Sequence, residues 1–131
     1  MGHGETILVV EDNKRTREVM IQALRQLNYH PISAATGREA MACLITYGDA
    51  ISLVVSDAIM PEMGVEEMLA AMESSNVDCP VIVVSGYLAP ARKEALCTYP
   101  NFVAWLSKPI ELVTLTSAIA RTLATSGQSK A

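Results

Sequence analysis

Residues 7–13 have the sequence ILVVEDN, a short apolar run that leads directly into two acids and an asparagine. An uninterrupted run of apolar, mostly β-branched side chains is typical of a strand buried on both faces, as in a parallel sheet. Residues 14–27 follow with apolar side chains at helical spacing. These are Met20, Ala23, Leu24 and Leu27. Asp12 or Asn13 is suited to cap the helix, so the chain is predicted to begin with a strand and a helix.

The same alternation continues along the chain. Further strands are predicted at residues 32–35, 51–55, 81–84 and 102–106. The predicted helices after them cover residues 36–47, 65–72, 90–97 and 112–123, and residues 125–131 are expected to form a frayed tail. Five strand–helix pairs predict one α/β domain over residues 1–131, with its core at 5–124 and a doubly wound parallel sheet between two layers of helices.

Composition excludes several classes of protein. The chain has 131 residues, half of them apolar, and a net charge of −4, which disfavours direct contact with nucleic acid. Its clean apolar runs at 7–10, 53–55 and 81–84 are three or four residues long, and a run of this length is too short to span a membrane. The three cysteines have no CxxC spacing, and the N-terminus lacks a signal peptide, so a cytoplasmic protein with reduced thiols is expected.

Polar residues follow four of the predicted strands. They are Glu11, Asp12, Asp57, Ser85 and Lys108. Because ligands of an open parallel sheet bind outside the carboxyl ends of its strands, these side chains are expected to share one crevice. Three crowded carboxylates need a shared proton or a hard cation such as Mg²⁺, and a lysine and a hydroxyl can bind phosphoryl oxygens. The combination predicts phosphoryl transfer with a carboxylate nucleophile.

Each of these residues also has an ordinary explanation when taken singly. Asp12 could be a helix cap, Ser85 a turn residue and Lys108 a surface lysine. Their occurrence together, at successive strand ends, is what favours a functional site.

Four motifs make the prediction more specific. They are ILVVEDN at 7–13, LVVSDAIMP at 53–61, VIVVSGY at 81–87 and LSKPI at 106–110. In order and spacing they resemble the receiver (response-regulator) domains of two-component signalling, with chemotaxis regulators as examples, over about residues 5–124. The resemblance implies a flavodoxin-like sheet of five parallel strands in the order 2-1-3-4-5, with five helices.

The resemblance also implies roles for single residues. Asp57 would accept a phosphoryl group from a phosphohistidine of a histidine kinase or phosphotransfer protein. The implied Mg²⁺ ligands are Glu11, Asp12, Asp57 and the main-chain carbonyl of Ile59. Ser85 matches the switch hydroxyl, Lys108 the lysine that pairs with the phosphate, and Trp105 the position of the usual switch tyrosine or phenylalanine. The Lys108–Pro109 bond is expected to be cis, as in the family.

Such a domain would assist its own phosphorylation and dephosphorylation without being an enzyme for another substrate. Phosphorylation would change the surface formed by the fourth helix, fifth strand and fifth helix. No membrane contact is expected of this domain, and a weak homodimer is compatible with the resemblance. The chain could be a single-domain regulator, but residues 4–12 and 85–87 look more like the receiver of a hybrid sensor kinase. Two departures are Gly64, one place earlier than the usual glycine, and the bulky Trp105.

Three other functions remain as alternatives. An aspartyl-phosphate phosphatase would usually have an acid two residues after the nucleophile, where this chain has Ile59. A flavin-binding carrier needs a phosphate cradle after the first strand, where Glu11 and Asp12 would repel the phosphate. A degenerate receiver that acts only as a docking module is disfavoured by the intact set of polar residues.

Overall fold

A computed structural model describes residues 3–58, 63–86, 90–108 and 111–130. Its five strands form one parallel sheet in the order β2-β1-β3-β4-β5, which confirms the predicted topology. The strands are β1 (Thr6–Val10), β2 (His30–Ala34), β3 (Ile51–Asp57), β4 (Val81–Ser85) and β5 (Phe102–Ser107). The helices are α1 (Lys14–Gln26), α2 (Gly37–Tyr47), α3 (Val65–Ser74), α4 (Pro90–Cys97) and α5 (Leu112–Lys130), with a short 3₁₀ helix η1 (Gly48–Ala50).

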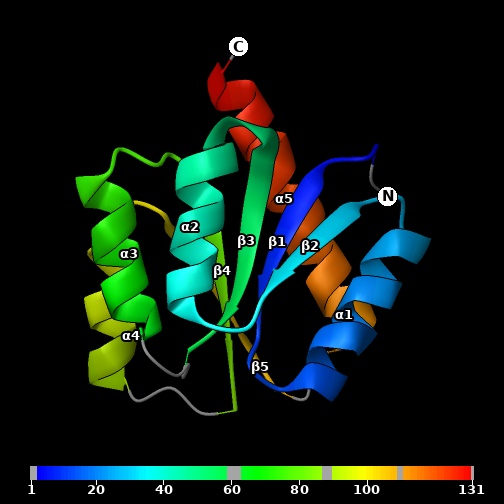
Figure 1. Ribbon diagram of the computed structural model, residues 1–131, viewed down its shortest axis with the longest axis horizontal. Coiled ribbons are helices and arrows are strands. Elements are labelled where there is room, and N and C mark those ends of the chain that lie inside the picture. The colour runs from blue at the N-terminus through cyan, green and yellow to red at the C-terminus, as the bar shows by residue number, and fades with distance from the viewer. Residues whose placement is uncertain (1–2, 59–62, 87–89, 109–110, 131) are drawn as a thin grey trace.

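Alternate side chains of the central strands supply two separate cores. Leu8 of β1 packs with buried residues of α2, α3 and α4, whereas its neighbours Ile7 and Val9 pack with residues of α1 and α5. Figure 1 shows the strands between these two groups of helices. Both faces are therefore covered, as the uninterrupted apolar strands require. Among the described residues, none of the helices is long and apolar enough to cross a membrane.

Two boundaries differ from the predictions in ways that matter for the site and the C-terminus. β3 extends through Asp57, which lies opposite Val84 of β4 and so belongs to the strand itself. α5 continues to Lys130, where a frayed tail was expected from residue 125. No proline interrupts its sequence after residue 112, so the helical backbone hydrogen bonds can continue.

Side-chain caps determine where the first two helices begin. Asn13 Oδ1 accepts a hydrogen bond from the Thr16 amide at 3.0 Å, so Asn13, one of the two predicted candidates, caps α1. At α2, Thr36 Oγ1 accepts from the Glu39 amide at 3.1 Å, and Glu39 Oε2 accepts from the Ala35 amide at 2.6 Å. This reciprocal arrangement resembles a capping box and holds the connection after β2.

The start of α2 packs tightly against the residue that precedes the α3 cap. A Cβ added to Gly37 would overlap the carbonyl oxygen of Met63 and lie 2.8 Å from the Met63 Cβ. Glycine is therefore required by space at position 37. Gly64, the early glycine, caps α3 with φ −72° and ψ 169°, a conformation open to any residue, so its position leaves the start of α3 regular.

Candidate functional site

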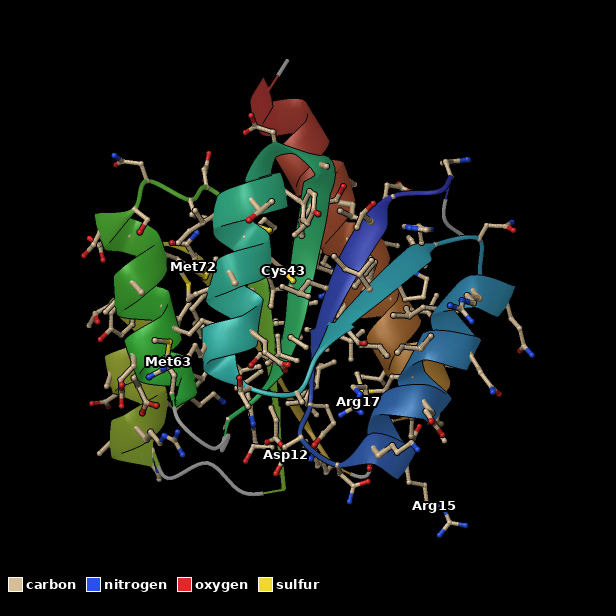
Figure 2. All side chains as sticks on the ribbon, viewed as in Figure 1. Asp12, Arg15, Arg17, Cys43, Met63 and Met72 are labelled. Atoms are coloured by element: carbon tan, nitrogen blue, oxygen red, sulfur yellow. The ribbon has the colours of Figure 1, made fainter. Side chains whose placement is uncertain are left out.

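The predicted polar residues meet at the carboxyl edge of the sheet. Glu11 directly follows β1 and is buried, while Asp12 beside it is exposed. Asp57 ends β3, Ser85 ends β4, and Lys108 follows β5. Figure 2 shows Asp12 at this edge, close to the beginning of α1. Two further sequence predictions, the Ile59 carbonyl and the Lys108–Pro109 bond, involve residues outside the described part of the chain.

Lys108 joins two of the carboxylates. Its Nζ donates to Asp57 Oδ2 at 3.0 Å and to Glu11 Oε1 at 3.2 Å. The side chains of Glu11 and Asp57 are 4% and 12% exposed, so both charges are largely shielded from water. The Lys108 amide also donates to the Ser85 carbonyl at 2.8 Å, which fixes the lysine backbone to the end of β4.

Glu11 is held from two further directions. Its Oε2 accepts from the Asn13 amide at 3.2 Å, and its carbonyl accepts from Arg17 Nη1 at 2.9 Å. Arg17 was not among the residues predicted for the site. An arginine in the first turns of a helix that follows two acids is a signal that could have suggested it. Arg17 supports the loop through the backbone, so it positions Glu11 without neutralising its carboxylate directly.

Three carboxylates form a group whose geometry suits a cation. One oxygen from each of Glu11, Asp12 and Asp57 lies within 4.8 Å of the others. Lys108 forms ion pairs with two of these carboxylates, so the formal charges of the four side chains sum to two excess negative charges. An all-oxygen donor set with two excess negative charges fits a hard divalent ion such as Mg²⁺.

The electrostatics of the site follow from burial and crowding. Burial raises the pKa of Glu11, the nearby charge of Asp57 raises it further, and the Asn13 amide and Lys108 only partly offset this. Burial by itself would lower the pKa of Lys108, but its ion pairs with Asp57 and Glu11 outweigh burial and raise it. The lysine is therefore charged at neutral pH, and Glu11 holds a proton more readily than an ordinary glutamate.

Ser85 and Trp105 lie on the neighbouring strands β4 and β5. Ser85 is 4% exposed and lies opposite Ser107, while Trp105 lies opposite Val83 in the same strand pair. The indole packs against the core beneath α2, α3 and α4, with Lys93 Nζ 4.6 Å from its ring centroid. Its buried Nε1 has no hydrogen-bond acceptor among the residues that the structure describes. The switch roles of Ser85 and Trp105 remain predictions.

A second charged group, absent from the sequence analysis, lies next to Asp57. Arg92 of α4 forms two hydrogen bonds with Glu66 of α3 and a third with the carbonyl of Ala58. Arg92 and Glu66 are 26 residues apart, and each is a common residue on a solvent-facing helix. Nothing in their local sequence indicates the pairing.

Comparisons with known proteins bear on the family and the fold of the chain. Residues 7–120 match the family described as the response regulator receiver domain. The sensor kinase CckA of Brucella abortus is 33% identical over 114 residues, which cover 87% of this chain and 12% of CckA. The receiver protein CpdR of the same organism is 28% identical over 117 residues, which cover 89% of this chain and 95% of CpdR.

A solved structure gives the same result for the fold. The chemotaxis protein CheY4 of Vibrio cholerae superposes with a TM-score of 0.79 at 27% identity, covering 91% of this chain and 98% of CheY4. The chain thus corresponds to a small part of one relative and to nearly the whole length of two others.

Proposed function

The chain belongs to the response regulator receiver domain family, and we propose that it is a phosphoacceptor switch in which Asp57 accepts the phosphoryl group. The observation that supports this proposal best is the position of Lys108 Nζ, 3.0 Å from Asp57 and 3.2 Å from Glu11. A fixed cation beside a shielded carboxylate is suited to bind a phosphoryl oxygen as charge develops there.

In the proposed step, a carboxylate oxygen of Asp57 attacks the phosphorus of a phosphohistidine on a histidine kinase or phosphotransfer protein. The O–P bond forms as the P–N bond breaks, and the imidazole leaves with the bonding electron pair, to be protonated by solvent. Lys108 transfers its contact from the carboxylate to the phosphoryl oxygens, and the Ser85 hydroxyl donates to another of them. Glu11, held by Arg17 and Asn13, keeps the lysine in place.

Glu11, Asp12 and Asp57 are the residues that would hold Mg²⁺, with the Ile59 carbonyl as a further proposed ligand. When bound, the ion would neutralise charge on the phosphoryl group and on the crowded carboxylates. The two excess negative charges of the cluster support this assignment, since they need a divalent partner.

Phosphorylation would change the surface of α4, β5 and α5, where a cytoplasmic partner would bind. Val103 of β5 and Val113 of α5 are 46% and 76% exposed, so both valine side chains are accessible to a partner. The match to CckA supports a receiver attached to a hybrid sensor kinase, whereas the match to CpdR supports a single-domain regulator. We favour the hybrid-kinase receiver, because of the similarity of residues 4–12 and 85–87 noted above.

Intact mass after incubation with acetyl phosphate and Mg²⁺ tests the proposal. Wild-type protein should gain about 80 Da, the mass of one phosphoryl group, and Asp57→Asn should gain nothing. An unmodified wild type that is folded by circular dichroism would contradict the switch and favour the docking-module alternative. A modified Asp57→Asn variant would show that another residue is the phosphoacceptor.

A further inference from the structure

Arg92 connects three elements near the phosphoacceptor. From α4, its Nε donates to Glu66 Oε2 at 2.6 Å and its Nη2 donates to Glu66 Oε1 at 2.8 Å. The same Nη2 donates to the carbonyl of Ala58 at 2.8 Å. Ala58 directly follows Asp57, so a single guanidinium ties α4 both to the first turn of α3 and to the backbone beside the phosphoacceptor.

The contacts of Arg92 differ in how firmly they are held. The Arg92 and Glu66 side chains are 30% and 34% exposed, so water can replace their bidentate contact more readily than it could in a buried pair. The Ala58 carbonyl, in contrast, belongs to a buried residue whose amide is bonded to Val84 of β4. Glu66 is therefore the partner that Arg92 can most easily release.

The guanidinium is also within the electrostatic reach of Asp57. The bidentate contact with Glu66 is the main cause that raises the pKa of Arg92, and the charge of Asp57 contributes as well. Phosphorylation would replace the single charge of Asp57 with a group of about −1.5 to −2 and three acceptor oxygens. Such a group is a stronger partner for a planar guanidinium than a half-exposed carboxylate.

We propose that Arg92 is a phosphoryl-binding residue, and that it exchanges Glu66 for the phosphoryl charge on Asp57 while it keeps its hydrogen bond to the Ala58 carbonyl. The inference rests on the proposed function of Asp57. In the unphosphorylated protein the pair with Glu66 restrains α4 against α3. In the phosphorylated protein the released Glu66 leaves α4 free to move relative to α3.

This exchange gives the two members of one ion pair opposite effects. Glu66 competes with the phosphoryl group for Arg92, so Glu66→Gln should speed phosphorylation by acetyl phosphate and lengthen the life of the phosphorylated form. Arg92→Gln removes the cation itself, so it should slow phosphorylation and shorten that life. For a half-exposed pair we expect changes of about twofold to fivefold in each direction.

Phosphorylation and dephosphorylation rates should be followed by intact mass, with thermal melting as a check on folding. Glu67→Gln is the matched control, because Glu67 lies in the same turn of α3 and is exposed. It should leave both rates unchanged. Arg92→Lys keeps the charge but loses the bidentate geometry, and its rates should lie between those of wild type and Arg92→Gln.

An ion pair that is only structural would make both glutamine variants less stable and change their rates in the same direction or not at all. Either outcome would overturn the role of Arg92 while leaving the phosphorylation of Asp57 intact. Absence of phosphorylation in the wild type would instead overturn the proposed function, and this inference with it. If Arg92→Gln fails to fold, Glu66→Gln and Arg92→Lys still test the proposal, because the exchange requires the rates of these two variants to change in opposite directions.

Discussion

Replacement of Lys108 by alanine removes a cation that lies within hydrogen-bond distance of both Glu11 and Asp57. Two charge-assisted hydrogen bonds are lost, and the group of three carboxylates is left without an ammonium. Lys108→Ala should therefore be less stable than wild type in metal-free buffer at neutral pH. It should also have a higher affinity for Mg²⁺, because a divalent ion can neutralise the same carboxylates.

The magnitude follows from the two contacts. Hydrogen bonds to charged groups contribute about 1.5–3 kcal/mol each, and the 31% exposure of Lys108 together with its own desolvation reduces their sum to about 2 kcal/mol. For a chain of this length that corresponds to a melting temperature about 8 °C lower. If bound Mg²⁺ removes most of the difference in stability between wild type and Lys108→Ala, the thermodynamic cycle requires the variant to bind Mg²⁺ about tenfold more tightly.

The pH dependence has a definite sign. The raised pKa of Glu11 means that the folded state binds more protons than the unfolded state from about pH 4.5 up to the folded pKa, so stability falls as pH rises through that window. Lys108 lowers the pKa of Glu11, so its loss raises that pKa further and widens the pH range over which stability falls. The difference in stability between Lys108→Ala and wild type should therefore grow between pH 4.5 and neutral pH. The contribution of Lys108 itself is lost only above pH 10.5, because its own pKa is raised.

Thermal melts with EDTA and with increasing Mg²⁺, at acidic and neutral pH, test these expectations. Lys14→Ala is the matched control, since Lys14 is an exposed lysine at the start of α1 at the same end of the sheet. It should change stability and Mg²⁺ affinity by much less. A Lys108→Ala variant as stable as wild type without metal, or one that binds Mg²⁺ more weakly, would refute the electrostatic account of the site.

Three further predictions test other parts of the structure. Asp57→Asn should be at least as stable as wild type in metal-free buffer, because it relieves carboxylate crowding; a melting temperature several degrees lower, with Asp78→Asn as the exposed control, would contradict this. The fluorescence emission of Trp105 should change with Mg²⁺ and again with acetyl phosphate in the wild type, but only with Mg²⁺ in Asp57→Asn. If acetyl phosphate phosphorylates the wild type fully without changing its emission, the indole does not move in the switch. Gly37→Ala should lower the free energy of unfolding in urea by about 1–3 kcal/mol, because its Cβ meets the backbone before α3, whereas Gly48→Ala, with open space around its Cβ, should not.

The strands and the main site could be predicted because their signals are local in the sequence, whereas the strand order was implied by the resemblance of four motifs to receiver domains. The apolar runs of β1, β3 and β4 are buried on both faces, and a buried parallel strand has a recognisable composition. The residue that follows such a strand must lie at the carboxyl edge of the sheet. Glu11, Asp57 and Lys108 could therefore be assigned to one crevice from the sequence, and they do lie in contact.

The tertiary structure alone determined which side chains pair across that edge. The choice of Glu11 and Asp57 as partners of Lys108, with Asp12 left exposed, depends on distances of 3.0–3.2 Å that no spacing in the sequence encodes. The contact of Arg92 with Glu66 is still less visible, because helical periodicity indicates which face of a helix is polar but not which residue of another helix lies opposite. Burial patterns are a property of each segment, whereas ion pairs between segments depend on how those segments are packed together.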